Sequence, residues 1–200
     1  MNKQNYDAQM RAVIQRVCAQ GKKPSLLLHA CCAPCSSACL ERLKDCFAIT
    51  VLFYNPNIED GEYEKRKAEL IRLIAETGWA DIIDCDHDTR QFYSAVKGLE
   101  HCPEGGERCA ACFALRLERA AAVTRDMGYD YFATTLTVSP LKDADLINQT
   151  GISLAQKYGV EWLPTDFKKR GGYARSIELS REHSLYRQNF CGCIFSQNNS

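Results

Sequence analysis

Cysteines carry the clearest chemical signal in this sequence. In the stretch LLLHACCAPCSSACLERL, residues 26–43, the adjacent Cys31 and Cys32 follow directly on an apolar run. A second group, CAAC, places Cys109 and Cys112 at the expected start of a helix, where residues three apart share one face. Two sulfurs from each segment would supply four thiolates, which suit either a [4Fe–4S] cluster or a tetrahedral zinc ion.

The spacing of the first group leaves the choice of metal open. Cys32 and Cys35 also form a C-x-x-C pair, and zinc ribbons pair such motifs. Zinc would leave Cys31 unused beside the metal, and this surplus ligand favours a multi-iron site.

A third group, CGC, separates Cys191 and Cys193 by a single glycine near the end of the chain. Gly192 would permit the tight turn of a small, strained disulfide, and strained bridges tend to be catalytic. The alternatives are a pair of metal ligands or an inert tail.

The other candidates give weaker signals. Free cysteine is often buried, so four cysteines are expected to be packing residues: Cys18, Cys39, Cys46 and Cys85. Cys102 could be either a packing residue or a functional one. His29 ends an apolar run, where a hydrogen-bonded core histidine is the expected role and metal ligation the alternative.

A basic segment, FKKRGGY, follows the last expected strand and contains Lys168, Lys169 and Arg170. Together with Tyr173 it could hold phosphates and stack on a base. A solvated run of charge is the equal alternative. The chain as a whole has 25 basic and 25 acidic side chains, so no global field attracts nucleic acid.

The amino-terminal residues are polar and lack the apolar segment of a signal peptide, and no window approaches the length of a bilayer span. We therefore expect a cytoplasmic protein with no membrane partner. In that compartment, clustering of the twelve cysteines favours metal binding or thiol chemistry over structural bridges.

Periodicity predicts the elements that must position these residues. Short apolar and β-branched runs predict strands over residues 25–30, 47–55, 80–86, 129–137 and 160–164. Amphipathic or alanine-rich runs predict helices over residues 5–20, 36–44, 62–78, 89–96, 108–128, 143–159 and 174–188. Ser36 or Ser37 is the expected cap of the second helix.

This alternation predicts one α/β domain over residues 1–200, with an amino-terminal helix and a core over 25–196. Its five-stranded sheet should be doubly wound and mostly parallel. Sites in such sheets lie beyond the carboxyl ends of the strands, where Cys31 and Cys32 fall. A last helix antiparallel to the fifth strand would leave Cys191 and Cys193 at the wrong edge. Either that helix crosses the top of the sheet or the tail folds back.

The ordered motifs also resemble a known family. The series CCAPC, RCAACF, TTLTVSP, FKKRGGY and YRQNFCGC, with VLFYNPN between, is similar to the QueH-type epoxyqueuosine reductases over residues 25–196. The resemblance implies a sheet of the adenine-nucleotide α-hydrolase (HUP-like) type and reduction of epoxyqueuosine to queuosine in the anticodon loop of tRNA. It also implies a [4Fe–4S] cluster with an adjacent iron.

The resemblance assigns roles residue by residue. It implies that the cluster ligands are Cys31, Cys32, Cys109 and Cys112, and that Cys191 and Cys193 form a redox-active pair. Cys35 is the candidate ligand of the adjacent iron. Lys168, Lys169 and Arg170 are expected to contact the tRNA.

The implied chemistry fits these parts. Removal of an epoxide oxygen to leave an alkene takes two electrons and two protons, so an electron donor is a further partner. Candidate proton donors near strand ends are Asp143, Tyr54 and Ser139. The phosphate-binding glycine loop of ATP-using relatives is missing, which disfavours an ATP-dependent enzyme. A zinc- or cluster-binding tRNA-modifying protein with another reaction is the remaining alternative.

Overall fold

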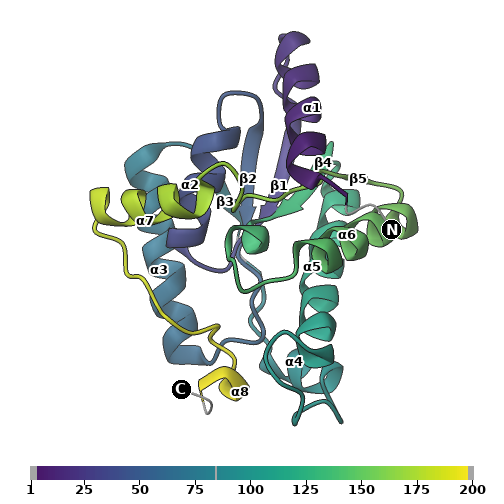
Figure 1. Cartoon of the computed structure of the whole chain (residues 1–200), viewed down its shortest axis with the longest axis vertical. Coiled ribbons are helices and arrows are strands. Elements are labelled where there is room, and N and C mark those ends of the chain that lie inside the picture. The colour runs from purple at the N-terminus through teal and green to yellow at the C-terminus, as the bar shows by residue number, and fades with distance from the viewer. Residues whose placement is uncertain (1–3, 84, 198–200) are drawn as a thin grey trace.

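A five-stranded parallel sheet forms the centre of the molecule, as the computed structural model of residues 4–83 and 85–197 shows (Figure 1). Its strands lie in the order β3-β2-β1-β4-β5, and every neighbouring pair is parallel. They are β1 Ser25–His29, β2 Ala48–Leu52, β3 Asp81–Ile83, β4 Tyr131–Thr134 and β5 Glu161–Trp162. The strand order reverses between β1 and β4. This is the predicted doubly wound sheet, and its switch point lies where β1 leads into the first cysteine group.

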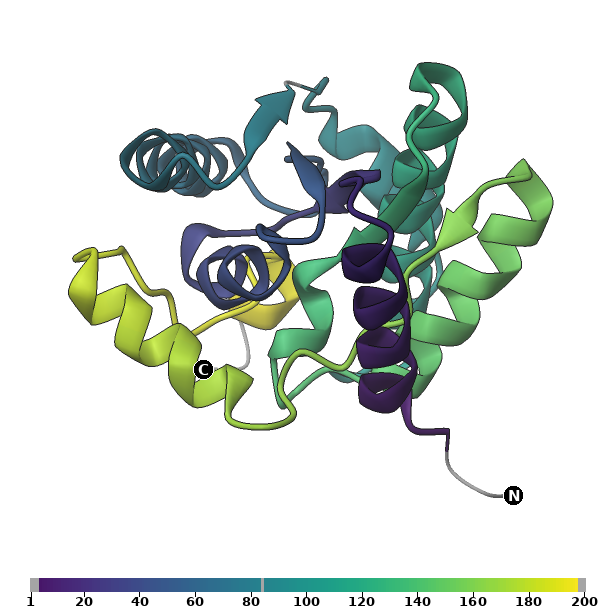
Figure 2. The same cartoon turned by 90° about the horizontal axis from the view of Figure 1, so that it is seen from above.

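Helices cover both faces of the sheet (Figure 2). They are α1 Tyr6–Ala19, α2 Ala33–Leu43, α3 Asp60–Thr77, α4 Thr89–Ala95, α5 Glu107–Met127, α6 Ala144–Tyr158, α7 Gly172–Glu182 and α8 Ile194–Gln197, with a short 3₁₀ helix, η1, at Thr135–Val138. None of the helices within the described residues has the length and apolar character needed to cross a bilayer.

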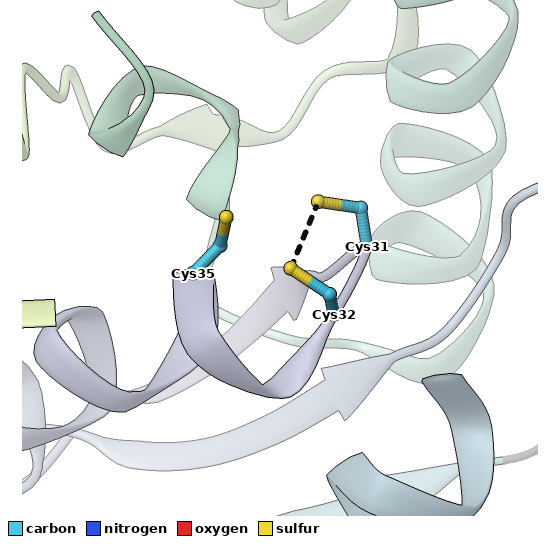
Figure 3. A group of neighbouring side chains, drawn as sticks. All are labelled: Cys31, Cys32 and Cys35. Carbon is cyan, nitrogen blue, oxygen red and sulfur yellow. Dashed lines mark hydrogen bonds between the residues drawn. The ribbon is translucent and has the colours of Figure 1, made fainter. Parts of the chain in front are cut away.

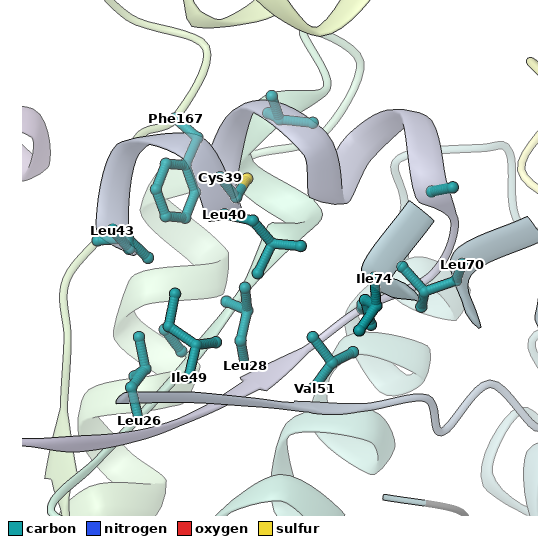
Figure 4. Close-up of a cluster of buried hydrophobic side chains, with 14 of the residues drawn as sticks. Leu26, Leu28, Cys39, Leu40, Leu43, Ile49, Val51, Leu70, Ile74 and Phe167 are labelled. Carbon is teal, nitrogen blue, oxygen red and sulfur yellow. The ribbon is translucent and has the colours of Figure 1, made fainter. Parts of the chain in front are cut away.

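The side chains of β1 alternate between two buried clusters, as a strand covered on both faces requires. Leu26 and Leu28 pack with residues of α2 and α3, among them Leu40 and Leu70 (Figure 4). Leu27 points to the other face and packs with side chains of α5 and α6. The last residues of β1 are thus held from both sides, which fixes the position of the cysteines that follow.

Helix α1 is attached to the first of these clusters. Met10 and Val17 are buried in it, and Arg42 Nη2 of α2 lies 2.7 Å from Asp7 Oδ1. A disulfide also joins Cys18, at the end of α1, to Cys46, before β2. The prediction that Cys18 is a packing residue was therefore wrong, whereas Cys46 packs against the first cluster and also forms the bridge. Cys18 is exposed rather than buried, and the turns that bear the two cysteines are brought side by side, with 5.1 Å between their Cα atoms.

Two element boundaries near the site differ from the sequence predictions. The second helix begins at Ala33, not at Ser36 or Ser37, because Pro34 starts it and Cys32 is its N-cap. The strand predicted over residues 129–137 ends at Thr134. There the Thr134 hydroxyl accepts a hydrogen bond from the Leu136 amide, which turns the chain into η1. Both changes bring loop and helix ends closer to the cysteines.

The carboxyl-terminal segment folds back, which settles the alternatives left open for the CGC group. The last long helix ends at Glu182 instead of residue 188, and Ser184 takes a positive φ of 50° as the chain reverses. The tail then runs along α3 toward α8 (Figure 1, yellow). Arg72 donates to the carbonyl of His183, and the Tyr186 amide donates to Glu69. Cys191 and Cys193 therefore return to the carboxyl edge of the sheet.

Candidate metal and redox site

The first cysteine group lies at the junction of β1 and α2. Cys31 and Cys32 follow the strand after one residue, and Cys35 occupies the first turn of the helix (Figure 3). The sulfurs of Cys31 and Cys32 are 3.9 Å apart, and all three sulfurs lie within 4.8 Å of one another. Because the residues share one tight turn, the sequence itself forces this closeness. Three soft donors at this spacing can bind one metal centre.

The three thiols do not share the same acidity. Hydrogen bonding with Cys32 and Cys35, helped by the positive charges of Lys142 and Arg116, holds the pKa of Cys31 well below its usual range despite burial. The same contact with Cys31, together with burial, raises the pKa of Cys32 to about 12. The pKa of Cys35 is also raised, for the same reasons. Cys31 is therefore the sulfur of this group that most favours the thiolate form.

A buried arginine lies beside these sulfurs. Arg116, on α5, is 1% exposed and donates to Asn55 Oδ1 over 2.6 Å. It stands one helical turn after Cys112, and its charge lowers the pKa of both Cys31 and Cys191. A buried cation is stable only beside compensating negative charge, which the thiolates supply.

His29 is a hydrogen-bonded core residue, as expected. Its Nδ1 lies 2.8 Å from the Thr134 hydroxyl and its Nε2 lies 3.0 Å from the Tyr54 carbonyl. Complete burial, reinforced by the charge of Arg116, lowers its pKa to about 3. The ring is therefore neutral and fastens β1 to β4 and to the chain after β2.

The second cysteine group lies in the first two turns of α5, where the sequence placed it. Cys109 Sγ accepts a hydrogen bond from the Gly105 amide over 3.2 Å, and its side chain packs against the cluster that contains Cys31 and Cys32. Cys112 is buried with Cys193 in a separate small cluster. Burial raises the pKa of Cys109 and raises that of Cys112 to about 11.

The CGC turn is held by a second buried arginine. Arg66 of α3 donates to the carbonyl of Cys191 over 3.0 Å and forms an ion pair with Glu62. Gly192 has a φ of 103°, the positive value that glycine was expected to supply. A Cβ there would lie 3.0 Å from the guanidinium nitrogens of Arg66. Residue 192 is therefore required to be small as well as flexible.

The two sulfurs of this turn differ in acidity. Hydrogen bonding with Cys193, supported by Lys142 and Arg116, lowers the pKa of Cys191 to about 5. The same contact raises the pKa of Cys193. A thiol beside a more acidic thiol is the reduced state of such a pair, from which a disulfide closes when two electrons are removed.

A cavity of about 550 Å³ joins the first and third groups. Its wall includes Cys31, Cys35 and Cys191, together with Ser139 and Lys142 from the loop after β4. Helix α7 and the tail complete it with Tyr173, Ser176, Arg187, Gln188, Asn189 and Phe190. The volume falls within the range of small-molecule sites, roughly 300–1,000 Å³.

The structure brings some of the predicted metal ligands closer together than others. Among the described residues, only Cys31, Cys32 and Cys35 form a group of three possible ligands within 4.8 Å. Cys109 adjoins them by packing, whereas Cys112 lies with Cys193. The four-cysteine cluster ligation by Cys31, Cys32, Cys109 and Cys112 stays a prediction.

The candidate proton donors divide by position. Ser139 lines the cavity. Asp143 instead caps α6 by accepting from the amides of Asp145 and Leu146. The Tyr54 hydroxyl donates to Gln91 over 2.5 Å, and burial raises its pKa to about 12. Only Ser139 therefore faces the space where a substrate would lie.

The basic segment lies beside the cavity rather than in it. Lys168, Lys169 and Arg170 line a groove of about 690 Å³ that shares Pro140, Leu141 and Lys142 with the cavity. Lys168 pairs with Asp166, while Lys169 and Arg170 are exposed.

Several residues of the site gave no separate signal in the sequence. Arg66, Lys142 and Arg187 are ordinary charged residues of a helix or loop until the fold brings them together. Arg116 could have been found, because it lies four residues after Cys112 and so shares its helical face.

Comparison with known proteins gives one consistent result. A family model described as "Epoxyqueuosine reductase QueH" matches residues 26–199, which include all three cysteine groups. The chain is 41% identical over 200 residues to an epoxyqueuosine reductase QueH of Staphylococcus epidermidis, covering 96% of this chain and 84% of that one. It is 40% identical to the Streptococcus pyogenes serotype M1 protein of the same name, over 96% and 78% of the two chains. A Thermotoga maritima protein of that name is 38% identical, over 86% and 90%.

Proposed function

The chain belongs to the QueH family of epoxyqueuosine reductases, and from this premise we propose that it reduces epoxyqueuosine to queuosine in tRNA within the cysteine-lined cavity. One observation carries this assignment to the site. Cys31, Cys35 and Cys191 open onto the same cavity, although Cys191 lies some 160 residues further along the chain. Because the tail returns to the first cysteine group, both groups can act on a single substrate in this cavity.

The donor atoms fit a metal centre of the soft, thiolate-bound type. We propose Cys31, Cys32, Cys109 and Cys112 as ligands of a [4Fe–4S] cluster and Cys35 as a ligand of an adjacent iron. Such a centre, when bound, supplies single electrons and a Lewis acid for the epoxide oxygen. Arg116 and Lys142 offset the negative charge of the assembled thiolates.

The CGC pair supplies the electron balance. When Cys191 and Cys193 close a disulfide, the Cys191 thiolate and the Cys193 thiol together lose two electrons and one proton, and the second proton that the substrate takes up comes from solvent. Epoxyqueuosine takes up two electrons and two protons, its epoxide C–O bonds break, and queuosine and water result. The disulfide must then be reduced by an external donor before the next turnover.

A tRNA substrate requires contacts outside the cavity. We propose that Lys168, Lys169 and Arg170 contact the phosphates of the anticodon arm while the modified nucleotide enters the cavity. The substrate is a tRNA, so we place the enzyme in the cytoplasm.

The test is conversion of epoxyqueuosine in tRNA, followed by nucleoside mass spectrometry, with anaerobically purified protein and a chemical reductant. Iron and sulfide content and the visible spectrum are recorded for the same sample. Cys31→Ala should lose both metal and conversion. Cys39→Ala is the matched control, because Cys39 is a buried cysteine of α2, the helix that follows Cys31, and among the described hydrogen bonds its thiol donates only to the Cys35 carbonyl. Zinc in place of iron, with no conversion by the wild type, would instead support the zinc-binding alternative.

A further inference from the structure

The loop between η1 and α6 separates the cysteine-lined cavity from the groove that contains Lys168, Lys169 and Arg170, in which four carboxylates also lie: Asp7, Asp143, Asp145 and Asp166. Its residues Pro140, Leu141 and Lys142 line both hollows and form a ridge between them, which we call the Pro140–Lys142 ridge. Leu141 is 78% exposed, the largest exposure of any large apolar side chain among the described residues. Single exposed apolar residues are ordinary on protein surfaces. Leu141 is unusual in its place, because it lies on the boundary between a cavity of mixed polar and apolar lining and a mainly polar groove.

The ridge forms a local turn with two long hydrogen bonds. The Leu141 amide donates to the Ser139 hydroxyl over 3.3 Å, and the Lys142 amide donates to the Ser139 carbonyl over 3.4 Å. Pro140 fixes one backbone angle. On the far side, the Asp143 carboxylate caps α6 by accepting two amides. The leucine is therefore presented to solvent from a turn that Pro140 and the capped start of α6 enclose.

The two hollows differ in what they can bind. The cavity has room for a single nucleoside, and the groove beside it carries Lys169 and Arg170 with their charges exposed. An anticodon loop whose modified nucleotide entered the cavity would have to place its neighbour on the other side of the ridge. The two bases would then lie apart, and their stacking would be lost. Proteins that separate stacked bases commonly insert an apolar side chain into the gap.

We propose that Leu141 is the wedge that separates the modified nucleotide of the anticodon loop from its neighbour. Its side chain replaces the lost stacking on the neighbouring base, while the modified nucleotide turns into the cavity. Leu141 is thus a positioning residue for tRNA and touches none of the reacting atoms. This inference depends on the proposed function, since it needs an epoxyqueuosine-containing RNA as the ligand.

A fluorescent stem-loop tests the wedge without relying on turnover. The probe is an anticodon stem-loop that carries epoxyqueuosine, with 2-aminopurine as the adjoining base, whose fluorescence rises when it is unstacked. Binding of the anaerobically purified wild type should raise that fluorescence. Leu141→Ala should abolish most of the rise and weaken binding by roughly tenfold, the loss expected for one base contact. Leu141→Met should restore both.

Two controls separate a wedge from other effects. Met127→Ala removes an apolar side chain that is 58% exposed at the end of α5 and lines neither hollow, and it should leave fluorescence and binding unchanged. The salt dependence of binding should stay the same in Leu141→Ala, because no phosphate contact is lost. Because Leu141 also forms part of the cavity wall, Leu141→Ala can slow reduction of the free epoxyqueuosine nucleoside, but by much less than its roughly tenfold loss of stem-loop binding.

The outcomes separate failure of the proposed function from failure of the wedge alone. A wild type that neither binds the stem-loop nor reduces the nucleoside refutes the proposed function and the wedge with it. A wild type that raises the fluorescence, with Leu141→Ala raising it equally, refutes the wedge alone. Equal losses of Leu141→Ala on stem-loop and free nucleoside would also overturn it, since they would show damage to the cavity.

Discussion

Replacing Arg66 with methionine should release the carboxyl-terminal tail from the cavity without removing any sulfur. The Arg66 side chain is 1% exposed. It donates to the carbonyl of Cys191 over 3.0 Å and to that of Phe190 over 3.4 Å, and pairs with Glu62 over 2.6 Å. Methionine keeps most of the apolar stem and provides none of these donors. The two tail carbonyls would lose their partner, and the CGC turn would lose its anchor to α3.

The size of the effect follows from those bonds. Hydrogen bonds to a charged group contribute about 1.5–3 kcal/mol each, and the longer contact to Phe190 should contribute less than the other. A loss of about 3 kcal/mol from the local stability of the tail is therefore expected. Since 1.4 kcal/mol corresponds to a factor of ten, the detached form should become on the order of 100 times more populated.

Hydrogen exchange measured by mass spectrometry reports this population directly. The amides of residues 187–193 should exchange on the order of 100 times faster in Arg66→Met, while those of β1 and α2 stay as in the wild type. Iron content should not change, and multiple turnover should fall because Cys191 spends less of its time at the cavity. Arg72→Met is the matched control. Arg72 also contacts the tail, at His183 and Ser184, but its side chain is 44% exposed.

The Arg72→Met control gives the exchange rate against which Arg66→Met is judged. Contacts of an exposed arginine contribute about 1 kcal/mol or less, so Arg72→Met should speed exchange by about fivefold at most. If residues 187–193 exchange no faster in Arg66→Met than in Arg72→Met, the buried arginine does not anchor the tail. Loss of iron in Arg66→Met would show that the tail also holds the metal centre, contrary to the proposed ligand set.

Three further predictions concern other parts of the molecule. Cys109→Ala and Cys112→Ala should each lower iron and sulfide content, and full content in either would remove that residue from the ligand set. Cys191→Ser should keep the visible absorption of the metal centre but stop after at most one turnover, and wild-type turnover would leave the CGC turn with a structural role only. Asp7→Asn should lower the thermal midpoint at pH 7. Burial alone would raise the pKa of Asp7, but its bonds to Arg42 lower that pKa overall. The difference in thermal midpoint between Asp7→Asn and the wild type should therefore shrink as pH falls below the usual carboxyl pKa, about 3.8. A difference that does not change with pH would refute this.

The sheet and its cysteine-bearing edge could be predicted because they depend on local pattern. Short apolar runs such as that before Cys31 are long enough for a strand and too short for a buried helix. Glycines placed the ends of α3 and α5, since Gly78 and Gly128 both take the left-handed conformation that stops a helix. The start of α2 was placed wrongly because serine is a common cap, whereas here Pro34 begins the helix within the cysteine loop.

Long-range features could not be predicted in the same way. The Cys18–Cys46 bridge depends on α1 crossing the sheet so that its end meets the turn before β2, and no local signal fixes that crossing. The path of the tail depends on Arg66, whose role appears only when α3 and the CGC turn are side by side. A charged residue on a helix is usually exposed to solvent, so the sequence alone would predict an exposed position for Arg66 rather than the buried one.

Two cations beside the site, one of them a buried arginine, explain how a fold suited to binding anions could hold thiolates instead. At a switch point, a helix N-terminus offers a partial positive charge to a ligand. Here α2 begins at that point with Cys32 as its N-cap and no side-chain capping bond. A helix end carries only about half a charge, which is too little for the Cys31 thiolate and still less once metal binding would deprotonate the other two sulfurs within 4.8 Å of it. Arg116 and Lys142 supply the remainder from two other elements, and both lower the pKa of Cys31 and of Cys191. The same two cations thus favour the thiolate in the strand loop and in the tail, which is the physical reason for the two cysteine groups to share one cavity.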